Sequence, residues 1–519
     1  MMDYEKYKKK VQNAFKLSGY SIKTELCKII LENWNDEIEF DQWIDAVIDN
    51  IQNLSLSHSN LTENDIETAV RNSLRSGQDD TETVLTVINA FDTPKFSYDI
   101  ERKKFVKDDT KNLLYFPNAD AKSELFTRRY TIILQRVLRN ELFKPTLLGD
   151  KSQDVQLSSI EQLLSAGNKK KNAIVLGLLT QVNEGKWFIE DPTGILQLDL
   201  TNARYHVGLF TENCIVLCDG TFEEKTLIVQ GMAHPPVELS IDSREYFNDI
   251  NTFGGPSKTS LKFSKRLSDI EKKNQNGIIF ISDVWLDKIE VLQKLKVFFQ
   301  GFNDVPPIAF VFMGNFLSND KGCEKAYELK TLFKGLGELI SRYQNLIEQS
   351  TFIFVPGKND PNAANILPRA SILDFITEDF RKKVPKSIFT TNPCRIQYCT
   401  QEIVVIREDL LTKMFRNTIH FPEHNDNIAD HFTKTILGQG HLSPFTLNVL
   451  PVYWSYDYAL SLYPLPDLIV VGDKFKAFTQ SYRECDVINP GPFSTNDYSF
   501  KVYYPATKEI DDSYIPADL

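Results

Sequence analysis

The chain has 519 residues, of which 42% are hydrophobic and 25% charged, and its formal net charge is −11. This length exceeds one ordinary core, so we expect two to four domains, and no apolar run approaches the roughly 18 residues that a membrane helix needs. The acidic balance argues against a chain whose main task is to wrap nucleic acid, because that task needs an excess of Lys and Arg to neutralise phosphates.

Residues 1–75 are predicted to form a small helical bundle. Apolar residues recur there at helical spacing in three sets: Ile22, Leu26, Ile29 and Ile30; Ile44, Val47, Ile48 and Ile51; and Ile66 and Val70. Thr62, with Asp65 three residues later, predicts the start of the third helix. The segment has no phosphate-binding loop, so we expect it to bind a partner or to brace the fold.

A polar stretch from Ser76 to Glu82 offers no apolar face to bury, and we interpret residues 76–110 as a linker. Residues 111–165 then predict a helical connection to the rest of the chain. Its central helix carries an apolar stripe surrounded by arginines: Phe126, Tyr130, Ile133 and Val137 with Arg128, Arg129, Arg136 and Arg139. A helix that binds nucleic acid is one interpretation, and a solvated basic face on a packing helix is the one we favour.

Residues 166–255 are predicted to form an OB-fold barrel. Five short strands are expected, over 173–179, 187–190, 195–200, 214–218 and 226–229. An OB-fold that binds single strands needs exposed aromatic rings and a positive groove. Trp187 and Phe188 are adjacent, so only one ring can face outward, and we favour a structural or protein-binding barrel.

In residues 256–519 apolar strands alternate with helices, which predicts helices packed on a mostly parallel or mixed sheet. Ligands normally bind at the carboxyl ends of such strands. The residues expected there are Asp283, Trp285, Asn315, Asn359, Asp360, His441, Asp473 and Phe475. A two-metal phosphoesterase needs several anionic or imidazole ligands converging at this edge, and only Asp283, His441 and Asp473 are usable ligands.

Three stretches carry a family resemblance: residues 354–361 (Phe-Val-Pro-Gly-Lys-Asn-Asp-Pro), 438–444 (Gly-Gln-Gly-His-Leu-Ser-Pro) and 463–473. They resemble the B-subunits of the eukaryotic replicative DNA polymerases. Residues 89–96 (Asn-Ala-Phe-Asp-Thr-Pro-Lys-Phe) and 101–105 (Glu-Arg-Lys-Lys-Phe) point to the epsilon branch of that family. The resemblance covers nearly the whole chain.

The resemblance implies a multidomain α+β protein with an N-terminal helical bundle, an OB-fold β-barrel and an inactive calcineurin-like phosphoesterase α/β sandwich. Against the family's metal-binding pattern, Trp285 replaces a histidine, Asn315 the bridging aspartate and Asn359 the acid histidine. Asp473 and Phe475 replace two further histidines. We therefore expect neither catalysis nor a cofactor.

The resemblance also implies the partners. Residues 256–519 with the barrel are expected to hold the cysteine-rich C-terminal domain of the DNA polymerase epsilon catalytic subunit. Residues 1–75 are similar to the helical lid of an AAA+ ATPase and are expected to contact the replicative helicase in the nucleus, with at most a weak DNA contact within the complex. Two alternatives stay open: a phosphoesterase with one metal held by Asp283, His441 and Asp473, and a single-strand-binding barrel.

Overall fold

The computed structural model divides the chain into two compact units, Met1–Thr83 and Val84–Leu519. The residues that it describes are 4–18, 20, 22–23, 26–34, 40–53, 61–62, 65–67, 69–70, 82–108, 113–144, 156–165, 170–319, 325–361, 364–422 and 427–516. Within these ranges no helix combines the length and the apolar character that crossing a membrane requires. The polar stretch expected to be the linker lies outside these ranges up to residue 81.

The described residues of the first unit include the helices α1 (Tyr4–Leu17), α2 (Leu26–Glu32) and α3 (Phe40–Asn53). Their apolar faces share a core that includes Phe15, Ile30 and Val47, and the Trp43 indole donates to the Ile30 carbonyl at 3.1 Å. Thr62 and Asp65 form the predicted capping box: the Thr62 amide donates to the Asp65 carboxylate at 2.9 Å, and the Asp65 amide donates to the Thr62 hydroxyl at 3.4 Å.

Residues 85–108 correct the predicted linker, because they fold with the second unit. They form β1 (Leu85–Asn89), η1 (Ala90–Asp92), β2 (Lys95–Asp99) and β3 (Lys104–Asp108). Strand β1 pairs with β14 (Cys394–Tyr398), about three hundred residues away, while β2 and β3 form a hairpin whose Phe96 and Phe105 pack on Phe247. Pairing over such a separation leaves no local pattern in the sequence.

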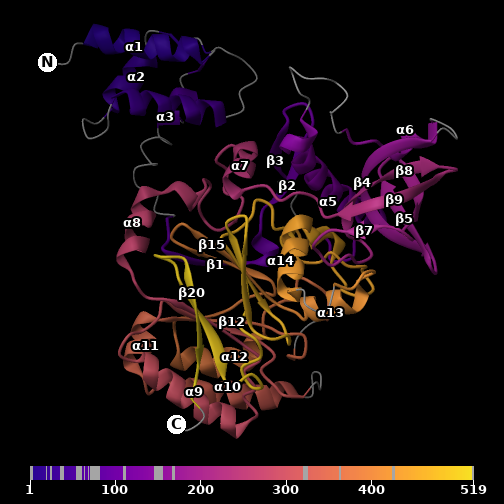
Figure 1. The fold of residues 1–519 in the computed structure, drawn as a ribbon. Helices are drawn as coiled ribbons and strands as arrows, with labels where there is room; N and C mark the ends of the chain where they lie inside the picture. Colours follow the sequence, from indigo (N-terminus) through magenta and orange to yellow (C-terminus); the bar gives the residue numbers. More distant parts are fainter. Residues whose placement is uncertain are drawn as a thin grey trace. The chain divides into compact units, whose positions relative to one another are not determined.

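The barrel confirms the OB-fold prediction. Its strands are β4 (Lys171–Asn183), β5 (Lys186–Asp191), β6 (Gly194–Asp199), β7 (Arg204–Tyr205), β8 (Ile215–Glu223) and β9 (Thr226–Ala233). They pair in the order β6-β5-β4-β8-β9-β7, and an additional β6–β9 pairing closes the barrel. Before it come α5 (Asp120–Arg139), η2 (Glu141–Phe143) and α6 (Ile160–Ser165), and α5 lies beside β4 (Figure 1).

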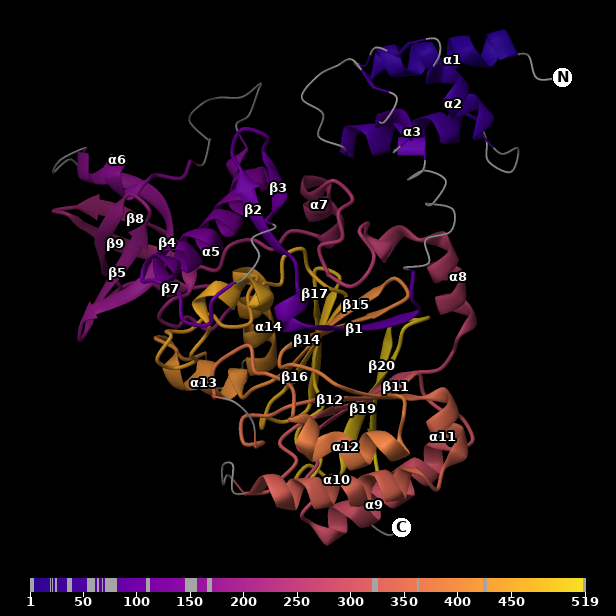
Figure 2. The ribbon, with the colours of Figure 1, turned by 180° about the vertical axis from the view of Figure 1, so that it is seen from behind.

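The rest of the second unit is a sandwich of two six-stranded sheets (Figure 2). The first sheet has the order β13 (Ser387–Phe389), β12 (Thr351–Val355), β11 (Ala309–Met313), β10 (Ile278–Ser282), β19 (Ser499–Tyr504) and β20 (Glu509–Tyr514). The second has the order β1, β14, β15 (Gln401–Arg407), β16 (Leu468–Gly472), β18 (Cys485–Asn489) and β17 (Phe478–Tyr482). A core between the sheets includes Phe280 and Val311 from the first and Val405 and Val470 from the second.

Helices cover both outer faces of the sandwich. On the first sheet lie α9 (Ile289–Phe302), α10 (Ala326–Ile340), α11 (Gln344–Gln349) and α12 (Asp374–Lys383), which bury residues such as Phe299, Phe333 and Phe380 against it. On the second lie α13 (Leu410–Asn417) and α14 (Ile428–Gln439). The remaining short elements are α7 (Ser240–Arg244), η3 (Glu245–Phe247), η4 (Leu261–Phe263), α8 (Lys265–Lys273) and η6 (Trp454–Leu460). These layers place the strand ends at one edge.

Candidate functional site

The candidate site lies where strands from both sheets end. Parallel pairing aligns Ser282 with Met313 and Met313 with Val355, so β10, β11 and β12 all end at one edge. On the other sheet, parallel pairing aligns Arg407 with Gly472, so β15 and β16 end together. The residues that follow these strands therefore gather from distant parts of the sequence, as the edge rule for α/β sheets predicts.

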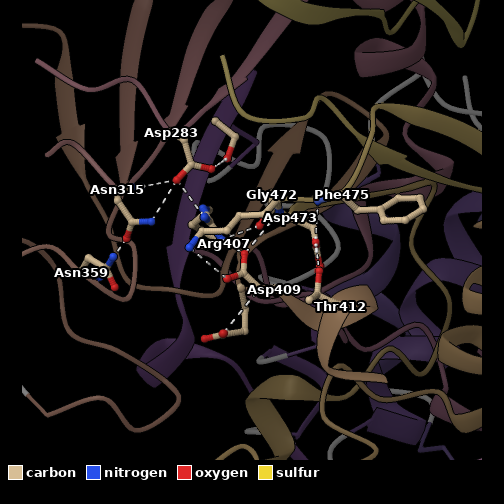
Figure 3. Close-up of polar contacts among 12 residues, drawn as sticks. Asp283, Asn315, Asn359, Arg407, Asp409, Thr412, Gly472, Asp473 and Phe475 are labelled. Carbon is tan, nitrogen blue, oxygen red and sulfur yellow. Dashed lines mark hydrogen bonds and ion pairs between the residues drawn. The ribbon is translucent and has the colours of Figure 1, made fainter. Parts of the chain in front are cut away.

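Asp283 is the centre of this edge and is fully engaged with protein donors (Figure 3). Its Oδ1 accepts hydrogen bonds from the Asn315 amide nitrogen at 3.2 Å, from Asn315 Nδ2 at 2.9 Å and from Arg407 Nη2 at 2.8 Å. Its Oδ2 accepts from the Ser282 hydroxyl at 3.1 Å. The carboxylate that sequence analysis selected as a metal ligand is thus neutralised by a guanidinium.

Arg407 is the residue of this site that sequence reasoning missed. It is 1% exposed, and its Nη1 donates to Asp409 Oδ1 and to the Gly472 carbonyl, both at 2.9 Å. Burial opposes the charge, but the Asp283 and Asp409 carboxylates outweigh burial and raise the pKa of Arg407. The guanidinium is therefore a fixed cation among the strand ends.

The side chains of Asn315 and Asp360 support the protein backbone at this edge. Asn315 Oδ1 accepts from the Asn359 amide nitrogen at 2.8 Å, so it ties the end of β11 to the loop after β12. Asp360 accepts from the amide nitrogens of Phe316 and Gly357, both at 2.7 Å. Burial raises the pKa of Asp360 to about 6, against the effect of these hydrogen bonds. The side chains of Asn315 and Asp360 are thus committed to holding these loops together.

Asp473, at the end of β16, caps a neighbouring element. Its carboxylate accepts from the Leu411 amide at 2.8 Å, the Thr412 hydroxyl at 3.0 Å and the Phe475 amide at 2.9 Å. Burial, together with the Asp409 charge, raises the pKa of Asp473 to about 6. Two of these bonds hold the first turn of α13, where backbone N–H groups need an acceptor.

Two aromatic residues occupy motif positions beside these carboxylates. Phe475 is partly buried against the core of the second sheet, and Trp285 is partly buried after β10. The Trp285 backbone amide donates to the Ser494 hydroxyl at 3.2 Å. Neither ring carries an atom that ligates a metal, so neither side chain can serve as a metal ligand.

His441 belongs to a different cluster from Asp283 and Asp473. Its Nδ1 accepts from the Ser443 amide at 3.0 Å, and its Nε2 lies 3.4 Å from Asp457 Oδ2. Asp457 is also bound by Arg129, whose Nε donates to it at 3.0 Å. Burial and the Arg129 charge lower the pKa of His441, so the ring is neutral near pH 7. Within the described ranges no group of three or more His, Cys, Asp and Glu residues could hold a metal ion.

The arginines of α5 correct a second prediction, because the face expected to be solvated is largely buried. Arg129 binds Asp457, Arg136 donates to the carbonyls of Leu437 and Gly438 at the end of α14, and Arg139 Nε donates to Glu238 at 2.8 Å. Burial lowers the pKa of Arg136 to about 10. These arginines fasten α5 to the sandwich rather than to a nucleic acid.

The barrel offers little support for stacking on bases. Trp187 packs against the barrel core, and Phe188 on the opposite face of β5 is also only partly exposed. Thus neither ring of the predicted pair stands free as a platform of the kind that single-strand binding requires.

Comparison with known proteins decides the family. The chain is 45% identical to DNA polymerase epsilon subunit 2 of Homo sapiens over 521 residues, covering 98% of both chains. It is 42% identical to the Drosophila melanogaster protein of the same name, covering 99% of this chain and 98% of that one. The chain belongs to the DNA polymerase epsilon subunit 2 family.

Three family models match successive parts of the chain. The model "DNA polymerases epsilon N terminal" matches residues 3–73, and the model "DNA polymerase epsilon subunit 2-like, OB-fold domain" matches 119–236. The model of the B-subunit of DNA polymerases alpha and epsilon matches 278–480. A solved archaeal phosphodiesterase aligns with 46% of this chain and 99% of its own at 13% identity, with a TM-score of 0.27, from which nothing follows here. As a member of the epsilon subunit 2 family, the chain is an accessory chain and not the polymerase's catalytic chain.

Proposed function

We propose that this accessory subunit has a phosphoesterase-like body without phosphoesterase chemistry and that it bridges the polymerase to the replicative helicase. One observation carries the first part: the Arg407 guanidinium lies 2.8 Å from Asp283, the one carboxylate at the end of β10. A two-metal reaction needs cations that can bind and polarise a phosphate oxygen. A guanidinium with its Nη1 and Nη2 hydrogen-bonded to the protein supplies charge without an open coordination position.

The other motif positions support the same proposal. Asn315 Oδ1 accepts from the Asn359 backbone amide, and the three protein bonds to Asp473 leave it little capacity for a metal. His441 is committed to Asp457 and Ser443. A phosphoesterase with one metal on Asp283, His441 and Asp473 would have to break all of these contacts, together with a buried ion pair.

The bridging part rests on the division of the chain. Residues 1–83 form a compact unit of their own, and the second unit joins barrel and sandwich through α5. We infer that the second unit holds the cysteine-rich C-terminal domain of the catalytic subunit, and that residues 1–75 contact the helicase assembly in the nucleus. Any contact of the barrel with DNA is weak and made within the complex.

Deletion of residues 1–75 tests this division of labour. The shortened chain should co-purify with the catalytic subunit to the same extent as the full chain and should lose the helicase assembly. The thermal transition of residues 84–519 serves as the control for folding. Loss of the catalytic subunit from a well-folded shortened chain would overturn the assignment of the two units.

A further inference from the structure

A cavity of about 480 Å³ lies at the junction of α5, the barrel and the loop over residues 446–448. It is separate from the strand-end site described above. The residues that carry the inference are Phe126 and Tyr130 from α5, Glu190 and Glu212 from the barrel, and Leu447 from the sandwich. Helix α5 lies beside β4 in both views of the molecule (Figures 1 and 2). The volume of the cavity is in the range of sites that enclose a side chain or a small ligand.

The charge of the lining is negative. Three carboxylates, of Glu190, Asp191 and Glu212, border the cavity, and Lys122 is the only cation among the lining residues. Asp191 is occupied, because it accepts from the Ile160 amide at 2.9 Å and the Thr193 amide at 2.7 Å. Glu190 and Glu212 thus remain as the carboxylates available to an incoming cation.

Each of these two glutamates is held in place by one hydrogen bond on one oxygen. The Thr180 hydroxyl donates to Glu190 Oε1 at 2.9 Å, and the Gln181 amide donates to Glu212 Oε1 at 3.3 Å. Over the described part of the chain neither glutamate forms an ion pair. Both side chains are partly buried, so a cation that paired with them would be partly shielded from water and salt.

Aromatic and aliphatic groups complete the lining. Phe126 and Tyr130 are one turn apart on the same face of α5, and Leu178 and Leu447 add aliphatic surface. A guanidinium has the two properties that suit this lining. Its edge forms paired hydrogen bonds with carboxylates, and its face stacks on aromatic rings. An ammonium offers only the charge, and phosphate groups would be repelled by the glutamates.

We propose that this cavity receives an arginine side chain presented by a protein partner. The walls are already fixed by ion pairs between α5 and the rest of the unit, from Arg129 to Asp457 and from Arg139 to Glu238. A preformed site loses less conformational entropy when its ligand binds. The inference goes beyond the bridging function, because it specifies the chemical group that binds here, an arginine side chain. It does not identify the partner that carries this side chain.

The test uses the full chain and two acetylated, amidated tripeptides, Gly-Arg-Gly and Gly-citrulline-Gly, whose central side chains differ in charge but hardly in shape. Saturation-transfer NMR at millimolar peptide should show the arginine peptide binding at least about tenfold more tightly, because charged hydrogen bonds are roughly twice as strong as neutral ones. The double variant Glu190→Gln with Glu212→Gln should lose this preference.

A matched control removes the same charge elsewhere on the barrel. Glu184→Gln with Glu224→Gln changes two exposed glutamates, and this variant should bind the arginine peptide as the unmodified chain does. Thermal unfolding checks that both variants are folded. Absence of binding, equal binding of the two peptides, or binding that survives in the Glu190/Glu212 variant would overturn the proposal. Because no polymerase subunit is present, these outcomes are independent of the bridging function.

Discussion

Arg407 and Asp283 form an ion pair that joins the two sheets of the sandwich. Arg407 ends β15 in the second sheet, Asp283 follows β10 in the first, and Nη2 lies 2.8 Å from Oδ1 with both side chains almost fully buried. Asp409 and the Gly472 carbonyl bind the same guanidinium. A cation supplied by the chain itself thus holds the strand ends together.

Replacement of Arg407 by Met should destabilise the second unit strongly. The change leaves the buried Asp283 carboxylate without its cation, and such an uncompensated charge costs about 3–5 kcal/mol. The free energy of unfolding, measured by urea titration of the second unit's transition, checks this value.

Two further variants distinguish loss of the Arg407–Asp283 ion pair from nonspecific destabilisation. Asp283→Asn combined with Arg407→Met should cost less than the sum of the single changes, because neither charge is then left alone. Lys382→Met, which breaks an exposed pair with Glu378, should leave the free energy of unfolding nearly unchanged, because exposed ion pairs contribute little. Additive costs in the double variant would show that Arg407 and Asp283 are not coupled.

Arg136→Met should loosen α5 from α14. The guanidinium donates to Leu437 O at 3.3 Å and to the Gly438 carbonyl, and buried carbonyls that lose their donor cost about 1–3 kcal/mol in total. Limited proteolysis should cleave the region around α5 faster in this variant. Arg102→Met, at an exposed pair with Asp99, is the control and should leave the cleavage rate unchanged.

The environment of His234 predicts that the free energy of unfolding falls in acid. Its ring stacks on Phe210 with centroids 4.3 Å apart, Gln439 Nε2 lies 3.0 Å from Nδ1, and Thr435 Oγ1 lies 3.2 Å from Nε2. Burial, with the Arg136 charge as a smaller cause, lowers the pKa of His234 to about 3. Between about pH 6.5 and 3 the unfolded chain therefore binds the additional proton, and stability falls as the pH falls.

His234→Gln should remove part of this acid sensitivity. From pH 6.5 to 4.5 the unmodified chain should lose about 1–2 kcal/mol more than the variant, since each pH unit is worth at most about 1.4 kcal/mol per proton. Asp360 and Asp473, with pKa values raised to about 6, act in the opposite sense but are present in both chains. His420→Gln, at an exposed ring, is the control, and equal slopes for all three chains would contradict the prediction.

The sequence was informative where patterns are local. The run of short predicted strands identified the barrel, and the strand-end rule selected Asp283, Asn315, Asp360 and Asp473 as neighbours of one edge. The strand β1 was missed because its partner β14 is remote, so residues 85–89 resemble any short polar-flanked segment. Likewise His441 could not be separated from Asp283 by sequence, because only folding assigns it to Asp457.

The buried arginines were the residues whose environment the sequence predicted least well. Arg129, Arg136 and Arg407 resemble surface residues in a hydropathy pattern, since Arg is almost never fully buried without a partner. Their partners, Asp457, the end of α14 and Asp283, lie more than one hundred residues away in sequence. Charge pairing at that distance is not encoded in any periodicity. Arg407, on which the proposed absence of phosphoesterase chemistry rests, was therefore visible only in the fold.

Metal content together with phosphodiester hydrolysis tests the central claim most directly. The full chain is dialysed against Mn²⁺, its bound metal is counted by mass spectrometry, and turnover of a generic phosphodiester is compared with that of Asp283→Asn and of the double variant Asp283→Ala with His441→Ala. We predict no stoichiometric metal and no turnover that depends on these residues. One or two Mn²⁺ per chain, with turnover abolished in the variants, would contradict the proposal and make this subunit an enzyme.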